Sequence, residues 1–276
     1  MKKVKKLWKN ARKKMTRRWA IMTAYQVSMF ILGVALLYGV VDYAVAKSYY
    51  ARSLNMPIGF SVTAQSEHVS SKNEADEWIG NVTSSTADNI ELSVCFLADG
   101  TPVVEEEPLI ASKNSVKLED VLSKLDETES DVGICINIKE TSHLKQLYDM
   151  LYKYGVTDRT FFVGVTAQSA HYVKRDCPSI PFYLNISPDR ARMIGDGYQQ
   201  KILDTLKRTG AVGINCKYTY ASERLATMLH ENGHKLSAWG INDWDQAARI
   251  LVIGADNVFT ASPDIIEQTI ENWKKF

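Results

Sequence analysis

The sequence lacks any cysteine pattern that would hold a metal ion or form a redox pair. No C-x-x-C pair and no zinc-finger spacing occurs among its four cysteines, which are Cys95, Cys135, Cys177 and Cys216. A metal finger is therefore excluded, and nothing in the spacing requires a disulfide. Because Cys95, Cys135 and Cys216 each lie in an apolar, strand-like run, we expect them to be small buried hydrophobic residues.

Beyond a lysine- and arginine-rich stretch at 1–18, internal repeats and low-complexity tracts are also missing, and no domain boundary is visible after about residue 58. This part of the chain shows no basic stripe with interleaved aromatic residues, so we expect no nucleic-acid partner. The 276 residues include 45% hydrophobic and 24% charged residues, which is ordinary for a globular protein. That length allows one large domain or two small ones.

Acidic residues are absent from positions 1–18, which hold ten lysines and arginines, and charge of either sign is absent from 20–41. The 22 uncharged residues can cross a hydrocarbon core of about 30 Å as a helix. Trp19 at one end and Tyr43, Tyr49 and Tyr50 at the other suit the two headgroup regions. We expect a single-pass anchor in the cell membrane, with a cytoplasmic N-terminus and an extracytoplasmic C-terminal domain.

The predicted organisation is a basic head that contacts membrane lipid (1–18), a transmembrane anchor (19–46), a linker (47–58) and a folded domain (59–276). A cleavable signal peptide is the alternative, because Ala44-Val45-Ala46 fits a small-residue cleavage site. The apolar run is longer than the usual 7–15 residues of such a peptide, which favours a retained anchor.

After the linker, strand-like runs alternate with helical ones. We predict strands at 60–63, 89–96, 132–138, 160–165, 181–186, 210–215, 235–239 and 257–260, with 102–105 as an extension of the second. Helices are predicted at 72–85, 118–125, 142–154, 167–173, 198–208, 221–231 and 243–252, and after Ser262-Pro263. Eight strands, each followed by a helix, predict a (β/α)8 TIM-like barrel, with a doubly wound open sheet as the alternative.

Several motifs, taken in order, resemble those of the glycerophosphodiester phosphodiesterase family. They are ADNIELSVCFLADGTPVVEEEP at 87–108, KLEDVL at 117–122, INIK at 136–139, NGHKLSAW at 232–239 with Asn242-Asp243, and GADNVFT at 254–260 with Pro263. The resemblance spans about residues 58–275 and implies a barrel that presents its site at the C-terminal ends of its strands. In the family, carboxylates hold a divalent metal ion and two histidines transfer protons.

Most of the family's catalytic residues are replaced in this sequence. The first histidine would fall near Ala64-Gln65-Ser66, and the Pro-Glu-Asn-Thr motif falls on Lys72-Asn73-Glu74-Ala75. Glu91 remains, but its partner acid is Ser93, and Asn137 replaces the glutamate that precedes Lys139. Glu106-Glu107 stand in place of a His-Asp pair, and Thr260-Ala261 in place of Thr-Asp. The resemblance therefore implies that the family's usual mechanism is lost.

The remaining candidates are Glu91, Lys139 and Glu106 as catalytic remnants, with Glu91 as a weak metal ligand. Glu91 and Lys139 could bind a polar or phosphate-bearing ligand, or could form an internal ion pair. Glu105-Glu106-Glu107 could supply a new acid or metal ligand, or could be a solvated loop. Trp239 matches the family's pocket tryptophan and could stack on a sugar or glycerol, or pack in the core.

His230 and His234 form a literal H-E-x-x-H pattern, which binds zinc only when both histidines lie on one helix. Gly233 is expected to end the helix between them, which argues against zinc.

We therefore expect a catalytically inactive binding or scaffolding module in cell-envelope polymer or phospholipid metabolism. Its partner would be an envelope polymer, a glycan or another membrane protein, and it would need no cofactor. The alternatives are a divergent phosphodiesterase that uses Mg²⁺ or Ca²⁺ with relocated residues, and a barrel that is only a spacer for a recruiting anchor.

Overall fold

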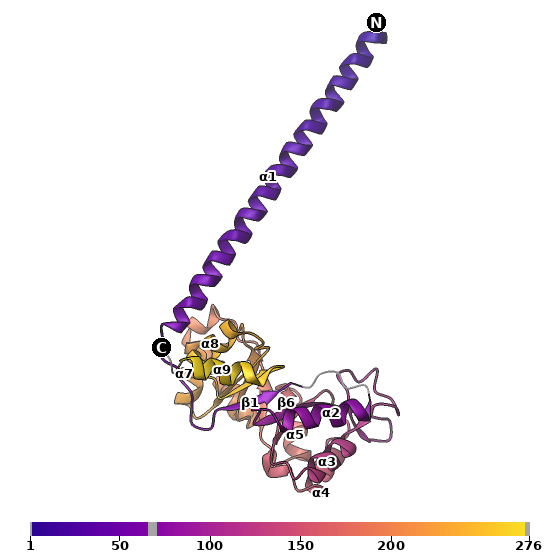
Figure 1. Ribbon diagram of the computed structural model, residues 1–276, viewed down its shortest axis with the longest axis vertical. Coiled ribbons are helices and arrows are strands. Elements are labelled where there is room, and N and C mark those ends of the chain that lie inside the picture. Colours follow the sequence, from indigo (N-terminus) through magenta and orange to yellow (C-terminus); the bar gives the residue numbers. More distant parts are fainter. Residues whose placement is uncertain (1, 66–70, 274–276) are drawn as a thin grey trace. The chain divides into compact units, whose positions relative to one another are not determined.

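The computed structural model describes residues 2–65 and 71–273 of the chain (Figure 1). They form two compact units, Met1–Ala51 and Arg52–Phe276. Each unit is described separately below.

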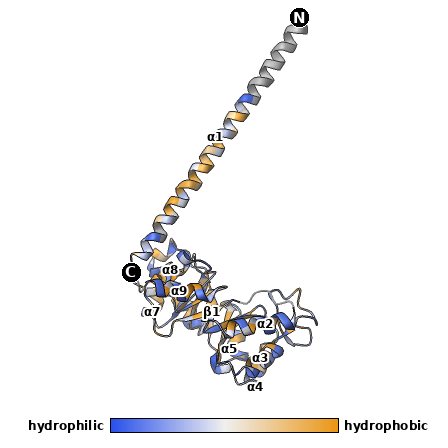
Figure 2. Cartoon of the chain, viewed as in Figure 1, coloured by the Kyte–Doolittle hydropathy of each residue, from blue (hydrophilic) through white to orange (hydrophobic). Residues whose placement is uncertain are grey.

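The first unit is one helix, α1 (Lys2–Tyr50). Its segment Ile21–Val41 has 21 residues and a mean hydropathy of 1.8, and is long and apolar enough to cross a membrane. Figure 2 shows this apolar stretch in orange along the middle of the helix. The helix continues to Tyr50, so it includes the first residues of the predicted linker. The physical reason is that no glycine or proline occurs between Asp42 and Pro57 to end it.

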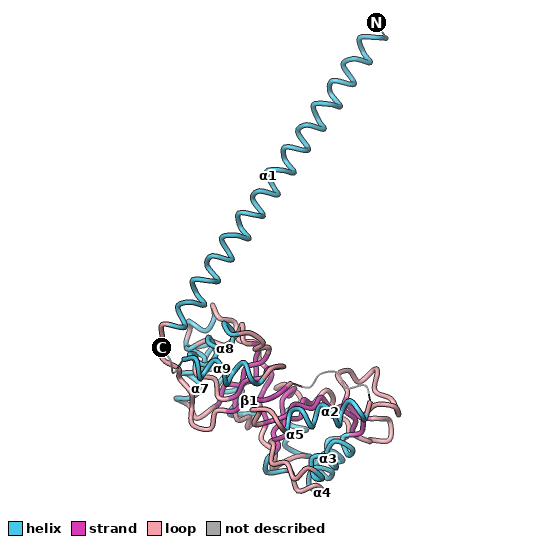
Figure 3. The backbone as a smooth tube through the Cα atoms, in the orientation of Figure 1, coloured by secondary structure: helices cyan, strands magenta, loops and turns pink. Residues whose placement is uncertain are grey.

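The second unit is a closed barrel of parallel strands (Figure 3). Its strands are β1 (Ser61–Ala64), β2 (Asn89–Phe96), β5 (Gly133–Ile138), β6 (Thr160–Val165), β7 (Phe182–Asn185), β8 (Gly213–Lys217), β9 (Lys235–Trp239) and β10 (Asn257–Thr260). Because β1 pairs in parallel with both β2 and β10, the sheet has no open edge there. The TIM-like barrel is therefore confirmed and the open-sheet alternative is wrong.

A helix follows each barrel strand before the next one begins. These helices are α2 (Lys72–Thr83), α3 (Leu118–Glu127), α4 (Leu144–Lys153), α5 (Ala170–Asp176), α6 (Asp196–Thr209), α7 (Glu223–Glu231), α8 (Trp244–Ile253) and α9 (Pro263–Trp273), with 3-10 turns at Thr157–Arg159 and Arg192–Ile194. Ser71, Ser222 and Asp243 begin their helices by accepting a hydrogen bond from a backbone N–H in the first turn. Such caps explain why these helix starts are readable from the sequence.

The connection after β2 differs from the prediction. The stretch expected to extend β2 is an antiparallel strand, β3 (Pro102–Val104), which pairs with β2 and with the short β4 (Val116–Lys117). The turn at Asp99-Gly100 reverses the chain, and Gly100 takes the positive φ of 86° that this reversal needs. The hairpin holds Glu105 and Glu106 beside the end of β2, where Glu105 N–H donates to the Ser93 carbonyl over 2.9 Å.

The core lies between the barrel and its helices and is built from buried aliphatic side chains such as Leu92, Ile136 and Leu147. All four cysteines are buried and unpaired. The prediction for Cys95, Cys135 and Cys216 is therefore confirmed, and burial raises the pKa of the Cys95 thiol to about 11, well away from thiolate chemistry.

The H-E-x-x-H segment does not lie on one helix. His230 is in the last turn of α7, and Gly233, at a φ of 72°, separates it from His234. The His230 Nε2 atom lies 2.8 Å from an oxygen of buried Asp256, which also accepts the Leu236 N–H at 2.8 Å. The helix-end interpretation is confirmed, and the partner of His230 is Asp256, directly before β10 at the N-terminal ends of the barrel strands.

The start of the second unit is held by its last helices. Trp273 of α9 donates its indole N–H to the Arg52 carbonyl over 2.9 Å, and the Arg52 guanidinium pairs with Glu223 of α7. The Asn55 N–H donates to the Leu251 carbonyl of α8 over 3.0 Å.

Candidate functional site

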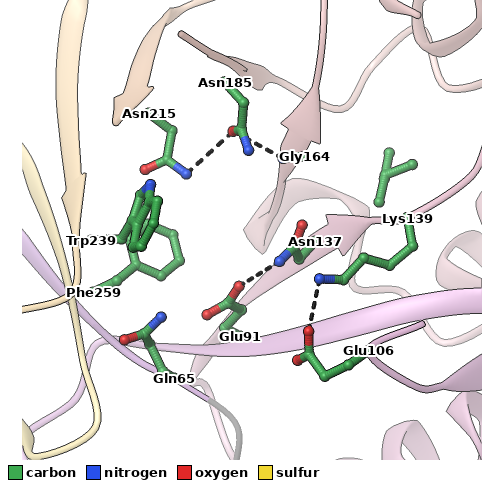
Figure 4. A pocket seen from close by; sticks show the side chains of 11 residues that line it. Gln65, Glu91, Glu106, Asn137, Lys139, Gly164, Asn185, Asn215, Trp239 and Phe259 are labelled. Carbon is green, nitrogen blue, oxygen red and sulfur yellow. Dashed lines mark hydrogen bonds and ion pairs between the residues drawn. The ribbon is translucent and has the colours of Figure 1, made fainter. Parts of the chain in front are cut away.

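A cavity of about 430 Å³ opens at the C-terminal ends of the barrel strands. Glu91, Glu106, Lys139 and Trp239 all line it, so the structure brings the four predicted site residues together (Figure 4). In a barrel of this class, strand ends deliver side chains from distant parts of the chain to one rim. The cavity is therefore the candidate functional site.

The alternation of side chains along the strands selects which residues face the cavity. Successive residues of a strand point to opposite sides, so Glu91 and Ser93 share one side of β2, and Asn137 and Lys139 share one side of β5. Ser93 and Asn137 are register partners on these neighbouring strands. The structure therefore places three of the positions that resemble metal-binding ones beside each other: Glu91, Ser93 and Asn137.

Glu91 is the buried acid of the site, with only 7% of its surface exposed. One of its carboxylate oxygens accepts a hydrogen bond from the Asn137 amide over 2.9 Å. Burial raises the pKa of Glu91 above its ordinary value, and the hydrogen bonds from Asn137 and Gln65 oppose that rise. Glu91 is thus a carboxyl group held by neutral amides.

Of the two interpretations of Glu91 and Lys139, the internal ion pair between them is not the pairing that the structure has. The Lys139 ammonium instead lies 2.7 Å from a Glu106 carboxylate oxygen, on the hairpin after β2. The sequence could not show this, because the pairing depends on the antiparallel turn that brings Glu106 back to the rim. Figure 4 shows this pair on one side of the cavity and Trp239 with Phe259 on the other.

Two amides that the sequence did not single out complete the cavity wall. Asn185 ends β7, and its register partner Asn215 lies within β8. The Asn185 Oδ1 atom accepts from the Asn215 amide at 3.3 Å and from the Gly164 N–H at 3.1 Å. Each asparagine is a polar residue near the end of a predicted strand, 181–186 or 210–215, and that position is the signal that could have identified them.

Gly164 lets the neighbouring strands approach closely. Its φ is +78°, and a Cβ atom at this position would lie 2.4 Å from the Ile138 carbonyl oxygen and 2.6 Å from Asn137 Oδ1. The register between β6 and β7 shifts between Phe162 and Val165, around this residue. Gly164 therefore leaves room for Asn137 on one neighbouring strand, and its N–H holds Asn185 on the other.

Trp239 ends β9 at the rim and keeps 37% of its surface exposed. Lys217, its register partner on β8, places its ammonium 5.9 Å from the indole ring centre. Phe259 lies beside Trp239 but is buried, and packs in the small inner cluster of the barrel. The exposed aromatic surface of the site therefore belongs to Trp239.

The side chains of the mouth do not fit the divalent metal ion that the family resemblance implies. Mg²⁺ and Ca²⁺ require several oxygen ligands with negative charge. At the three relevant positions only Glu91 is acidic, and Asn137 directs an N–H, not an oxygen, at it. Within residues 2–65 and 71–273, no group of three histidine, cysteine, aspartate or glutamate side chains could hold a metal ion.

The position expected for the family's first histidine falls at the end of β1. Of the stretch 64–66, Gln65 lines the cavity, and Ser66 lies outside the described residues. Lys72-Asn73-Glu74-Ala75 form the first turn of α2, where Glu74 donates its N–H to the Ser71 cap at 3.3 Å. The described part of the mouth therefore carries the Gln65 amide close to the position where the resemblance places a histidine.

No protein-family model matches the chain, and no curated protein matches it by sequence. Several solved structures share its fold. A glycerophosphodiester phosphodiesterase from Parabacteroides distasonis has a TM-score of 0.60 and 16% identity, over 79% of this chain and 98% of its own. A phosphodiesterase from Oleispira antarctica, solved with the product sn-glycerol-3-phosphate, has a TM-score of 0.59 and 15% identity, over 82% and 99%.

A third such structure is a glycerophosphodiester phosphodiesterase from Agrobacterium tumefaciens, with a TM-score of 0.56 and 14% identity, over 76% of this chain and 99% of its own. At these identities the similarity is one of fold. The chain has a barrel of the glycerophosphodiester phosphodiesterase type, as its motifs predicted, together with an N-terminal helix that could span a membrane.

Proposed function

Starting from this barrel, we propose that the protein is a membrane-anchored, extracytoplasmic binding or scaffolding module without phosphodiesterase activity. It serves cell-envelope polymer or phospholipid metabolism by holding a ligand or a partner protein at the outer surface of the membrane. The barrel keeps the family's fold and its cavity but uses them for recognition.

The observation that carries this proposal is the neutral chemistry around Glu91. Phosphodiester hydrolysis needs a cation to neutralise the phosphate and groups that move protons at both ester oxygens. The described mouth offers the amides of Gln65 and Asn137 beside Glu91, and amides do not transfer protons at neutral pH. Its one lysine, Lys139, is already paired with Glu106.

The proposed location rests on the N-terminal helix. Ile21–Val41 meets the length and hydropathy of a membrane span. The lysines and arginines that precede it favour a cytoplasmic N-terminus and contact with anionic lipid. The barrel then lies on the opposite side, where envelope polymers, glycans and membrane-protein partners are within reach.

Hydrolysis of glycerophosphodiesters by the full chain in lipid nanodiscs, with Mg²⁺ or Ca²⁺, tests the loss of catalysis. We expect no turnover above that of Glu91→Gln. The matched control is Glu107→Gln, since Glu107 is an exposed acid in the loop after β3 and does not line the cavity. Turnover that is lost in Glu91→Gln but kept in Glu107→Gln would overturn the proposal and favour a divergent metal-dependent phosphodiesterase.

Sidedness can be tested by thiol labelling, because the four native cysteines are buried. Ile58→Cys introduces a thiol at a fully exposed position of the barrel unit, and Lys5→Cys introduces one in the basic head. A membrane-impermeant maleimide should label intact cells of the first variant and only lysed cells of the second. The reverse pattern would refute the proposed orientation. Removing residues 1–46 should release the barrel from the membrane fraction and, if the barrel itself holds the partner, leave pull-downs unchanged.

A further inference from the structure

The cavity is lined by primary amides rather than by charged groups. Four amide side chains face it, and they are Gln65, Asn137, Asn185 and Asn215. Each primary amide offers N–H donors and a carbonyl acceptor. A hydroxyl group also donates and accepts, so a polyhydroxyl molecule matches this wall group for group. An anion, by contrast, offers only acceptors and would use only half of what the amides present.

One amide carries a buried atom that no part of the described chain satisfies. Asn215 donates its Nδ2 hydrogen to Asn185, but its Oδ1 atom is buried and has no hydrogen-bond partner. The hydroxyl oxygen of Ser93, also buried, is in the same state. Buried polar atoms without partners are rare in folded proteins because leaving them unpaired costs free energy. Asn215 also lines the cavity, so a hydroxyl bound beside this side chain can supply the missing hydrogen bond.

The charges of the cavity disfavour a phosphodiester. Its lining includes one cation, Lys139, and two acids, Glu91 and Glu106. The charges of Lys139 and Glu106 cancel, so the net charge of the lining is that of Glu91, which is either zero or negative. Lys217 lies beside Trp239 at the rim but does not line the cavity. An anionic ligand would therefore find no unpaired positive charge in the described lining, whereas a neutral ligand has no such penalty.

The remaining wall supplies an aromatic surface. Trp239 is 37% exposed and lies across the cavity from the Lys139–Glu106 pair (Figure 4). The ring face of a sugar carries C–H groups and is apolar, while its edge carries hydroxyls. An indole and several amides that line one pocket therefore match the two parts of such a molecule.

We infer that the barrel mouth binds a neutral polyhydroxyl unit, a sugar or a polyol, with the Trp239 indole against its C–H face and the asparagine amides on its hydroxyls. This inference rests on the proposed binding function and names the class of ligand. The cavity volume of about 430 Å³ lies in the range of small-molecule sites.

Calorimetric titration of the full chain in nanodiscs with three pure probes tests the inference. Methyl glucoside represents a sugar ring, ribitol an acyclic polyol, and glycerophosphoglycerol a phosphodiester. We expect millimolar or tighter binding of methyl glucoside or ribitol, and weaker binding of the phosphodiester. The better of the two neutral probes decides between sugar and polyol.

Variants then locate the binding. Trp239→Ala should weaken the neutral probe about tenfold or more, because it removes the stacking surface. Trp244→Ala is the matched control, since Trp244 has a similar exposure of 40% but does not line the cavity, and it should bind as the unaltered protein does. Asn215→Leu keeps the approximate size of the side chain but removes its carbonyl, and should also weaken the neutral probe. A thermal melt of each variant verifies that the barrel is folded.

Three results would overturn the inference: no binding of either neutral probe at millimolar concentration, tighter binding of the phosphodiester that Trp239→Ala abolishes, or equal losses in Trp239→Ala and Trp244→Ala. These failures are separable from failure of the proposed function. A chain that is inactive in the hydrolysis assay but prefers the phosphodiester refutes only the ligand class, whereas turnover dependent on Glu91 refutes the inactive barrel itself.

Discussion

Replacing Asn137 with aspartate would place a second carboxylate beside the buried acid of the mouth. The Asn137 amide nitrogen now lies 2.9 Å from a Glu91 oxygen, and aspartate has nearly the same shape. Two unit charges at that separation repel by about 6 kcal/mol at an effective dielectric constant of about 20. The pair avoids the full repulsion by keeping one proton.

Proton uptake sets the expected magnitude. Holding a carboxyl group protonated at about pH 7, when its ordinary pKa is about 4, costs about 4 kcal/mol. Because the mouth is open to solvent, we expect Asn137→Asp to lower the free energy of unfolding by about 2–4 kcal/mol at neutral pH. The folded variant binds this proton more tightly than the unfolded chain does, so its stability rises as the pH falls. The loss should shrink below the raised folded pKa and nearly vanish at about pH 4.

Urea denaturation of the Arg52–Phe276 unit, at about pH 7.5 and about pH 5 with a chelator present, measures the effect. The double variant Glu91→Gln/Asn137→Asp is the control, because it exchanges the acid and the amide and keeps one hydrogen bond between them. It should recover most of the loss at about pH 7.5, leaving about 1 kcal/mol. A loss that is equal at both pH values, or that persists in the double variant, would refute the electrostatic reasoning.

Three further predictions concern the stability of the same unit. Gly164→Ala should lower the free energy of unfolding, measured by urea denaturation, by about 2 kcal/mol or more, because it adds a backbone clash to a positive φ. The control Gly155→Ala, at a φ of +66° with open space around it, should lower it by only about 1 kcal/mol. Equal losses in the two variants would contradict the close approach of the strands. Asp256→Ala should lower the free energy of unfolding by about 2–4 kcal/mol in the same assay, since it leaves the Leu236 N–H and the His230 imidazole without their acceptor. A change below about 0.5 kcal/mol would refute that role of Asp256. Lys139→Ala should change the unfolding free energy by about 1 kcal/mol or less, because its ion pair is partly solvated, and a loss above about 2 kcal/mol would show that the pair stabilises the barrel.

The fold could be read from the sequence where local signals agree. The bounds predicted at 89–96, 160–165, 235–239 and 257–260 match those of β2, β6, β9 and β10. Each is a short apolar run, and turn residues follow two of them, Asp99-Gly100 after β2 and Gly240 after β9. The β3–β4 hairpin was missed because a three-residue strand and a two-residue strand carry almost no periodic signal, and because antiparallel pairing depends on partners distant in the sequence.

The site was only partly predictable. Glu91, Lys139 and Trp239 were found because they sit in recognisable motifs, and the structure gathers them at one cavity. Asn185 and Asn215 were missed because an asparagine near the end of a predicted strand is also typical of the turn that ends it. The partner of Lys139 could not be chosen between two nearby acids, since that choice depends on how the β2–β3 turn folds back.

The contacts around Arg52 determine how the barrel would carry mechanical load. If α1 is fixed in a membrane, any pull on the barrel enters at this residue. Its carbonyl is held by Trp273 and its guanidinium by Glu223, while Asn55 is bonded to α8. Tension is therefore shared among α7, α8 and α9 before it reaches β1, whose pairing with β2 and β10 closes the barrel. A tether attached in this way can be stretched by a moving partner while the cavity at the opposite ends of the strands keeps its shape.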